Sequence, residues 1–558
     1  MARDEMTRRT FLGTSVLGSA LAATDLRWPA GAAAAVRGRV VAAAAQAPSE
    51  LDEVTVSQLQ DGMRTGRWTA RSLAEQYLAR IDASDQRGPN LRSVLETNPD
   101  ALTIADGLDA ERKAKGPRGP LHGIPVLIKD NVATADRMHT SAGSLALATS
   151  IALRDSFVAE RLRAAGAVIL GKTNLSEWAN IRANHSSSGW SGRGGQCRNP
   201  YALDRSPSGS SSGSAVAVAA NLCAIAVGTE TDGSITSPGS ACGIVGIKPT
   251  VGLVSRAGII PISHTQDTAG PLARTVADAA ALLGALAGRD PRDAATRQSP
   301  AAGPDYAQAL DPGGLKGLRL GVARKRYTGY SQPVDALFED ALRALRDAGA
   351  VIVDPADVTT EDHLAPSPSG SFGNAESEVL LTEFKADLNA YLAGLGPGAP
   401  VKTLADVIAF DEQNRAREMP FFGQDLFEQA QAKGPTTAPA YRAALARCRR
   451  WSRTLGIDAV MDRRRLDAII CPTQGPTWLI DHVNGDSFGT SCTTPAAVAG
   501  YPHVTVPMGF VAGLPVGLSL FGRAWSEPVL IKAAFAYEQA SRMRRAPQLL
   551  PTVEPAAG

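Results

Sequence analysis

The 558-residue sequence lacks the features that mark several common protein classes. Positive and negative side chains nearly balance, at 57 Lys and Arg against 55 Asp and Glu, and no block of like charge stands out. Nucleic-acid binding needs a concentrated basic stripe, so no nucleic-acid partner is expected. Beyond the first 25 residues, no apolar run is long enough to predict a transmembrane helix.

Two arginines near the start of the chain introduce a signal-like segment. Arg8 and Arg9 lie in the run TRRTFL, residues 7–12, which resembles the twin-arginine export signal. The apolar run 11–23 that follows is too short and too rich in Gly, Ser and Thr to span a bilayer. We expect residues 1–47 to be an export signal with an undetermined cleavage site. The mature protein would be periplasmic or extracellular, without stable membrane association; the alternative is an unstructured basic N-terminus.

Cysteine is scarce, and its spacing excludes the common metal sites. The six cysteines show neither a C-x-x-C pattern nor a paired histidine pattern: Cys197, Cys223, Cys242, Cys448, Cys471 and Cys492. No zinc site is therefore predicted, and nothing in the sequence calls for a metal or cofactor. Twin-arginine cargo folds in a reducing compartment, so we interpret these cysteines mainly as small buried apolar residues.

The rest of the composition is ordinary for a globular protein, with 44% hydrophobic and 20% charged residues. Helical and strand-like runs alternate from about residue 50 to the end, which predicts one large α/β unit at 48–558. Strands are expected at 124–128, 167–170, 222–227, 318–322, 350–353, 466–471 and 504–506. Helices are expected at 56–81 with a break at Gly66, and at 157–165, 215–221 and 334–348. Residues 184–200 and 290–314 are predicted loops, and the mostly helical, polar region at about 360–455 is predicted to cover the site.

Two serines in glycine-rich backbone flank a short apolar helix. Ser210 lies in SPSGSSSGS, residues 206–214, and Ser234 ends GTETDGS, residues 228–234. The turn before Ser234 can point successive backbone N–H groups into one concavity, which is a nest for an oxyanion. A Ser/Gly-rich loop alone is more often a flexible linker or a phosphate nest. The apolar helix and the second motif favour a nucleophilic serine.

Lys129 is the candidate base for such a serine, because no histidine lies in a suitable glycine-rich loop. It follows an apolar run in GIPVLIKDN, residues 123–131. Burial would lower the lysine pKa toward neutrality, whereas the neighbouring Asp130 would oppose that shift. Taken alone, Lys129 would more often be an exposed lysine at a strand end. The S-x-x-K pattern of β-lactamases is absent at every lysine.

Together these motifs resemble the amidase signature family. The chain also carries GKTNLSEW at 171–178, VGIKPT at 245–250 and AGYPHVTVP at 499–507. The resemblance covers roughly residues 50–545 and is most similar to bacterial peptide amidases in TETDGS, residues 229–234, and SGWS, residues 188–191. It implies the amidase signature fold, an α/β architecture with a large mixed central sheet flanked by helices on both faces.

The resemblance also assigns roles to single residues. It implies a Ser–cis-Ser–Lys triad with Ser234 as nucleophile, Ser210 as bridging serine and Lys129 as base. A cis peptide bond would precede Ser210. The remaining implied positions are the oxyanion-hole N–H groups and two supporting residues: Thr231, Asp232, Gly233 and Ser234 for the hole, and Ser211 and Gly209 for support.

Three residues depart from the commoner family pattern GTDTGGSIR: Glu230, Asp232 and Thr236. The missing arginine puts in doubt substrates with a free carboxylate near the scissile amide, because a charge-assisted clamp is absent there. The negative charge of Asp232 suits a neutral or cationic substrate. Two tryptophans and two acids are further candidates for the cleft. Trp178 and Trp190 are as often core residues in such places, and a solvated surface position or a helix cap is the safer interpretation of Asp155 and Glu177.

The expected activity is hydrolysis of a primary carboxamide to carboxylate and ammonia through an acyl-enzyme. The C-terminal amide of a peptide is the expected substrate, and free small aliphatic or aryl amides are the alternative. Two other classes remain open. The first is the ammonia-producing component of a transfer-RNA amidotransferase, which the export signal and Thr236 disfavour. The second is a non-catalytic binding protein, which the presence of all three triad residues disfavours. The sequence does not determine the oligomeric state.

Overall fold

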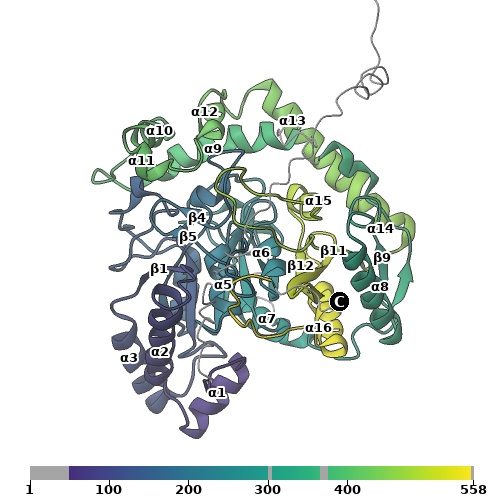
Figure 1. Cartoon of the computed structure of the whole chain (residues 1–558), viewed down its shortest axis with the longest axis horizontal. Coiled ribbons are helices and arrows are strands. Elements are labelled where there is room, and N and C mark those ends of the chain that lie inside the picture. Colours follow the sequence, from purple (N-terminus) through teal and green to yellow (C-terminus); the bar gives the residue numbers. More distant parts are fainter. Residues whose placement is uncertain (1–48, 300–304, 365–374, 554–558) are drawn as a thin grey trace, which may run out of the picture. The chain divides into compact units, whose positions relative to one another are not determined.

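An eleven-stranded mixed sheet forms the centre of the computed structural model, which describes residues 49–299, 305–364 and 375–553 (Figure 1). The predicted signal segment lies outside these ranges. The strand order is β1-β3-β2-β6-β8-β7-β12-β13-β11-β9-β10. The bounds are β1 Val94–Thr97, β2 Pro125–Lys129, β3 Val168–Thr173, β6 Ile225–Glu230, β7 Val245–Lys248, β8 Thr268–Ala273, β9 Arg319–Val322, β10 Val351–Val353, β11 Ala468–Pro472, β12 His503–Val511 and β13 Leu514–Phe521. A separate two-stranded ribbon joins β4 Trp190–Ser191 to β5 Gly195–Gln196.

The strands that carry the site are buried throughout their length. β2 pairs in parallel with β3 and with β6, and every residue of these three strands is buried. Strands covered on both faces form continuous apolar runs, which is why the sequence pattern located them. β6 continues into an antiparallel pairing with β8. Lys129 and Glu230 therefore end neighbouring parallel strands at the same edge of the sheet.

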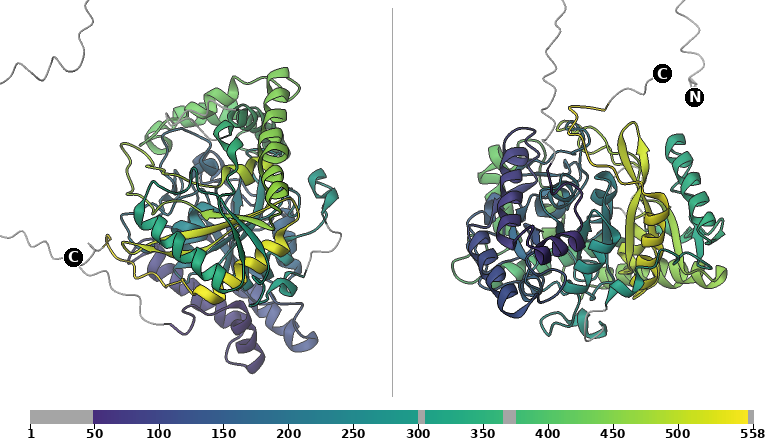
Figure 2. Two further views of the ribbon diagram at one scale, coloured as in Figure 1. Left: turned by 90° about the vertical axis from the view of Figure 1, so that its right-hand side faces the viewer. Right: turned by 90° about the horizontal axis from the view of Figure 1, so that it is seen from below.

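Helices pack against the sheet, and Figure 2 shows the molecule from two further directions. α2 and α3 pack together and contact β3, whereas α8 and α16 pack together and contact β12 and β13. The helices outside the 375–449 region are α1 Val56–Thr65, α2 Ala70–Arg80, α3 Ala101–Lys115, α4 Phe157–Ala164, α5 Ser212–Ala219, α6 Thr236–Ala241, α7 Val276–Leu286, α8 Gln332–Asp347, α14 Asp458–Arg464, α15 Thr494–Ala499 and α16 Glu527–Ser541. The large mixed sheet with its helices confirms the predicted fold class.

Local sequence explains where the first helices begin and end. Thr55 and Gln58 form a reciprocal capping box at the start of α1, which satisfies two backbone N–H groups that would lack partners. α1 ends at Gly66, whose φ of 79° lies in the left-handed region that glycine adopts at low cost. Thr69 caps α2 in the same way. The predicted break at Gly66 is therefore confirmed.

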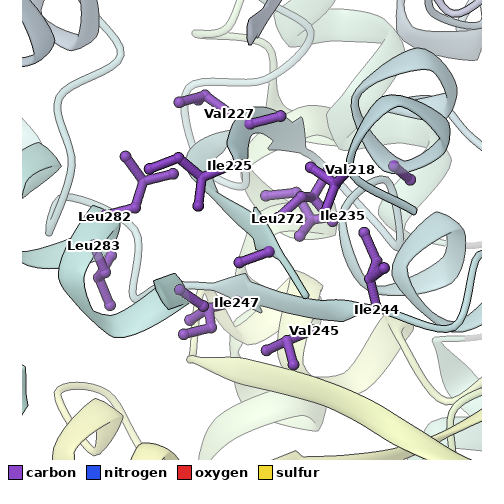
Figure 3. Packing of buried hydrophobic residues seen from close by; sticks show 14 of the residues in the cluster. Val218, Ile225, Val227, Ile235, Ile244, Val245, Ile247, Leu272, Leu282 and Leu283 are labelled. Atoms are coloured by element: carbon purple, nitrogen blue, oxygen red, sulfur yellow. The ribbon is translucent and has the colours of Figure 1, made fainter. Parts of the chain in front are cut away.

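Part of the main apolar core lies between α5, α7 and the strands β6, β7 and β8 (Figure 3). Val218, Ile225, Val227, Ile247 and Leu272 there are all fully removed from solvent. Complete burial of one such side chain contributes roughly 1.5–3 kcal/mol. This packing fixes α5 and β6; the Ser210 loop leads into α5, and the Ser234 turn follows β6.

A layer of five helices follows β10 in the sequence: α9 Ala375–Gly394, α10 Leu404–Gln413, α11 Arg415–Glu418, α12 Asp425–Gln431 and α13 Pro439–Arg449. It has its own apolar cluster, in which Leu381, Phe384 and Phe427 pack with Trp178 and Ile181. α9 is thereby held against the loop that follows β3. Among the described residues, no helix is both long and apolar enough to cross a membrane. All six cysteines are buried free thiols, as predicted.

Candidate active site

Lys129 ends β2 with its amine fully buried. Its Nζ lies 2.7 Å from Ser210 Oγ and 3.1 Å from Ser211 Oγ, and also 2.9 Å from Thr229 Oγ1 and 3.2 Å from the Thr229 carbonyl oxygen. Burial lowers the pKa of Lys129 to about 7, and the charges of Asp267 and Glu230 only partly oppose that shift. The amine therefore exchanges its proton near neutral pH.

Asp130 does not oppose the lysine as the sequence suggested it would. Its Oδ2 accepts hydrogen bonds from the hydroxyl and the backbone N–H of Ser141 and from the N–H of Gly143. Its carboxyl lies 3.5 Å from the guanidinium of Arg193. The side chain is thus engaged away from Lys129.

The serine loop 208–212 is fixed by hydrogen bonds to β6 and to the second serine loop. The Gly209–Ser210 peptide bond is cis. The Ser211 hydroxyl donates to the Thr229 carbonyl at 3.0 Å and accepts from the Thr229 N–H at 3.1 Å. The Ser211 N–H donates to the Ser234 carbonyl at 3.1 Å. A Cβ at Gly209 would stand 2.2 Å from Ser176 Oγ, so any larger residue would displace that hydroxyl.

Ser234 follows a tight turn and is 8% exposed. Gly233 has φ of 79°, in the left-handed region that glycine adopts readily. Within the described chain, the N–H groups of Asp232, Gly233 and Ser234 donate to no other residue. Three free donors in one tight turn form an anion-binding nest of the predicted kind.

Glu230 explains one of the departures from the family pattern. Its Oε2 accepts from the N–H groups of Ile235 at 2.8 Å and Thr236 at 2.9 Å. The carboxylate thereby satisfies backbone donors at the start of α6 and closes the turn that presents Ser234. The Thr236 side chain contacts the same carboxylate at 3.2 Å. Glu230 and Thr236 therefore support the turn that carries Ser234, and neither lines the cavity.

Ser210 and Ser234 open onto one cavity of about 600 Å³. Residues 179–188 and 488–494 line opposite parts of its wall, and Glu376 and Leu380 of α9 complete it. Thus the helical region predicted to cover the site does contribute two side chains to the wall. Arg326 and Glu361 also line the cavity.

The two candidate tryptophans lie in the core and not on the cavity wall. Trp178 is 2% exposed, and its ring centroid lies 5.9 Å from that of Phe427. Trp190 is 4% exposed and packs edge-on against Phe421 and Phe422. Both serve the packing of the α9–α13 layer.

The two candidate acids are engaged in ion pairs outside the cavity. Asp155 Oδ2 lies 2.9 Å from Arg163 Nε, and its Oδ1 accepts from the N–H of Ala135 at 2.7 Å. Glu177 Oε1 lies 2.5 Å from Arg182 Nη1, with both side chains 1% exposed. Neither acid lines the cavity.

Sequence reasoning missed several groups that the structure brings to the site. Thr229 supplies two of the four contacts to Lys129, and its place in GTETDGS could have identified it. Glu376, Glu361 and Arg326 reach the cavity from segments remote in sequence, with no motif around them.

The comparisons with known proteins agree with this geometry. A family model described as Amidase matches residues 72–531. The chain is 42% identical over 506 residues to a probable amidase of Arabidopsis thaliana, covering 90% of this chain and 92% of that protein. It is 36% identical over 500 residues to a glutamyl-tRNA(Gln) amidotransferase component of Chloroflexus aurantiacus, covering 88% and 97%. The structure of the native peptide amidase from Stenotrophomonas maltophilia superimposes with a TM-score of 0.84 at 50% identity, covering 90% and 100%. The chain is an amidase and belongs to the amidase signature family.

Proposed function

We propose that this amidase hydrolyses a primary carboxamide to carboxylate and ammonia through an acyl-enzyme on Ser234. The observation that carries the proposal is the 2.7 Å contact between the Lys129 amine and the Ser210 hydroxyl, on the wall of the cavity that also holds Ser234. A neutral buried amine is a base strong enough to activate a serine through an intermediate hydroxyl.

In the acylation step the Ser234 oxygen attacks the amide carbonyl carbon. Its proton passes to the Ser210 oxygen, while the Ser210 proton passes to Nζ of Lys129. The developing oxyanion is held by the free N–H groups of Asp232, Gly233 and Ser234; loss of one such donor costs about 2.7–4 kcal/mol in transition-state energy. The same relay returns a proton to the nitrogen that leaves as ammonia.

In the deacylation step a water molecule attacks the ester carbonyl carbon of acylated Ser234. The relay through Ser210 takes the water proton to Lys129 and then gives it to the departing Ser234 oxygen. The products are the carboxylate and the restored serine hydroxyl. Both half-reactions therefore need Lys129 neutral at their start.

For the substrate, we propose the C-terminal amide of a peptide. Two observations support it. First, the chain is 52% identical to a peptide amidase solved with the inhibitor chymostatin, and the match covers 99% of that protein. Second, the cavity of about 600 Å³ has room for groups beyond the amide itself. Free small aliphatic or aryl amides are the second candidate, which the matches to proteins named only as amidases support equally.

The test measures ammonia released from amidated dipeptides and from simple amides by the purified chain. We expect higher kcat/KM for the dipeptide amides, and loss of activity with both in Ser234→Ala. Ser210→Ala and Lys129→Met should each lower kcat by at least about 100-fold. An active Ser234→Ala protein would reject the mechanism, whereas a preference for simple amides would reject only the peptide substrate.

We also propose that residues 1–47 direct export through the twin-arginine pathway. The support is the paired arginines in TRRTFL. A fusion of this segment to a folded reporter should reach the periplasm, and Arg8→Lys with Arg9→Lys should retain it in the cytoplasm. Export of the double variant would contradict the assignment.

A further inference from the structure

Two carboxyl groups meet on the wall of the active-site cavity. Asp232 belongs to the turn that precedes Ser234, and Glu376 lies in the first turn of α9. Both carboxyl groups face the same cavity, and the charge of Asp232 raises the pKa of Glu376. Two ionised carboxylates that share one wall repel each other, so the pair needs either a shared proton or a cation beside it.

The other contacts of the pair do not supply a cation. Asp232 Oδ2 accepts from the Thr494 hydroxyl at 2.7 Å, whereas Asp232 Oδ1 is buried without a donor among the described residues. Glu376 is 2% exposed, and its Oε1 accepts from Gln266 Nε2 at 3.0 Å. In the described chain, neither carboxyl has a Lys, Arg or His nitrogen within 4.0 Å.

The cavity wall holds a single basic side chain among its described residues, and that side chain is already engaged. Arg326 Nη1 lies 3.0 Å from Asp362 Oδ1, and its Nε lies 3.7 Å from Glu361 Oε1. Glu361 also accepts a hydrogen bond from the Tyr327 hydroxyl. The Asp232–Glu376 pair is thus left as the uncompensated acidic feature of the cavity.

The protonation state of the pair follows from its burial. Burial raises the pKa of Glu376 well above its ordinary value, and the charge of Asp232 raises it further. Burial also raises the pKa of Asp232, against the two threonine hydroxyls that lower it. One proton shared by two carboxyls leaves one negative charge beside the nucleophile. Asp232 is half-buried on the cavity wall, so a cationic group bound in the cavity can compensate that charge.

We propose that Asp232 and Glu376 form a subsite for an organic cation on the substrate. The cation belongs to the acyl part of the amide, on the side chain of the residue that bears the scissile carboxamide. The proposal rests on the proposed function, because the cation is placed relative to Ser234. Asp232 stands two residues before Ser234, and both line the same cavity. A guanidinium suits the site best, since its fork of N–H donors can bridge two carboxyl groups and supply the donor that Asp232 Oδ1 lacks.

The experiment compares two nearly isosteric substrates, N-acetyl-arginine amide and N-acetyl-citrulline amide, which differ in the charge of the side chain. For the unmodified enzyme we expect kcat/KM to favour the arginine amide by at least about tenfold, as expected for a charge-assisted contact. In Glu376→Gln and Asp232→Asn that ratio should fall toward one. The ratio is the readout because it cancels any effect of either variant on the shared chemistry.

Glu378→Gln is the matched control variant. Glu378 also lies in the first turn of α9, but its Oε2 pairs with Lys433 Nζ at 2.5 Å, and it does not line the cavity. This variant should keep both the ratio and the activity. A ratio near one in the unmodified enzyme, or an unchanged ratio in both pair variants, would overturn the subsite.

Binding separates failure of the subsite from failure of the proposed function. Calorimetry with Ser234→Ala protein should give tighter binding of the arginine amide than of the citrulline amide, and Glu376→Gln in that background should remove the difference. Equal binding of the two amides rejects the subsite even if hydrolysis is normal. Selective binding without hydrolysis of either amide by the unmodified enzyme keeps the subsite and rejects the reaction.

Discussion

Nζ of Lys129 lies 2.7 Å from Oγ of Ser210, although the two residues are 81 positions apart in the sequence. β2 brings the lysine to this point, and the loop before α5 brings the serine. The amine has no carboxylate within ion-pair distance among the described residues, and hydroxyl and carbonyl oxygens surround it. Such an environment favours the neutral amine over the ammonium ion.

The pH dependence of catalysis follows from this contact. Because burial lowers the pKa of Lys129 to about 7, the neutral base predominates above that pH and is lost as pH falls. We expect kcat to reach a plateau above about pH 8 and to fall by about tenfold for each unit below pH 7. A pH–rate profile with a saturating amide measures this. A kcat that stays constant down to pH 5.5, or rises in acid, would contradict a lysine base.

Ser211 is expected to position Lys129 without taking part in the proton relay. Its hydroxyl lies 3.1 Å from the amine and also bridges the backbone of Thr229. In Ser211→Ala the ammonium form loses one acceptor, so the acid limb of the pH–rate profile should shift to lower pH. We expect kcat to fall by about 10–100-fold, less than in Ser234→Ala. An unchanged limb together with full activity would remove the positioning role.

The sequence located seven of the eleven central strands and the triad motifs because these signals are local. It did not predict β1, β7, β8 or β13; glycine or proline interrupts the apolar run in the last three of these. Buried parallel strands form continuous apolar runs, so β2 and β6 could be found without their neighbours. Ser210 lies in the glycine-rich loop before α5 and Ser234 in the glycine-containing turn after β6, and these loops need glycine for close approach and for a left-handed turn. Short-range constraints of this kind remain visible in a single sequence.

The remaining parts of the site depend on contacts between distant segments. Glu376 comes from α9 and meets Asp232 across 144 positions, and no pattern around Glu376 distinguishes it from other helix acids. The direction of the Asp130 side chain could not be predicted either, because it depends on the loop at 141–143 that receives its carboxyl. Such pairings follow from the tertiary fold and leave no local signature.

The cysteines give a prediction about thiol chemistry. All six are buried free thiols, and burial raises the pKa of Cys223 and of Cys448 to about 12. Cys492 differs, because its burial is outweighed by contacts with Cys471 and His503, which lower its pKa to about 5. All six thiols are buried, so reagent cannot reach them, and the folded protein should not react with a thiol reagent on the timescale of minutes. The unfolded chain, without added reductant, should react at all six positions. Fewer than six labelled positions by mass spectrometry would reveal a disulfide and contradict the assignment.

Gly213 is a packing constraint on the serine loop. A Cβ there would stand 2.2 Å from the Ser93 carbonyl oxygen and 2.5 Å from that of Asn174, both of them backbone atoms that cannot turn aside. We expect Gly213→Ala to lower the free energy of unfolding by about 1–3 kcal/mol and to lower kcat, because α5 and the attached serines must shift.

The control for Gly213 is Gly107→Ala in α3, where a Cβ would meet no atom within 4 Å. Alanine at an exposed helical position is expected to stabilise by about 0.5–1 kcal/mol, with kcat unchanged. Urea unfolding and steady-state kinetics on the two variants measure both effects. Equal stability changes in the two variants would show that the contact with Ser93 and Asn174 does not constrain the loop.

Arg182 is expected to stabilise the cavity wall through a buried ion pair. Its guanidinium lies 2.5 Å from Glu177 and donates to the Glu418 carbonyl oxygen at 2.6 Å, and all three side chains are at most 1% exposed. Arg182→Met keeps most of the side-chain volume but leaves buried carboxyl groups without their cation. Breaking one partner of such a pair costs about 3–5 kcal/mol.

The effect of Arg182→Met should appear in both stability and substrate binding, because the adjacent Ile181 and Ala183 line the cavity. We expect a lower midpoint of urea unfolding and a higher KM for the amide. Arg64→Met is the matched control: Arg64 pairs with Asp61 on the surface, with side chains 72% and 66% exposed, so water already screens that pair. Its loss should change the free energy of unfolding by less than about 1 kcal/mol. If the two variants were equally stable, the buried guanidinium would contribute no more than an exposed one, and the structural role assigned to Arg182 would be wrong.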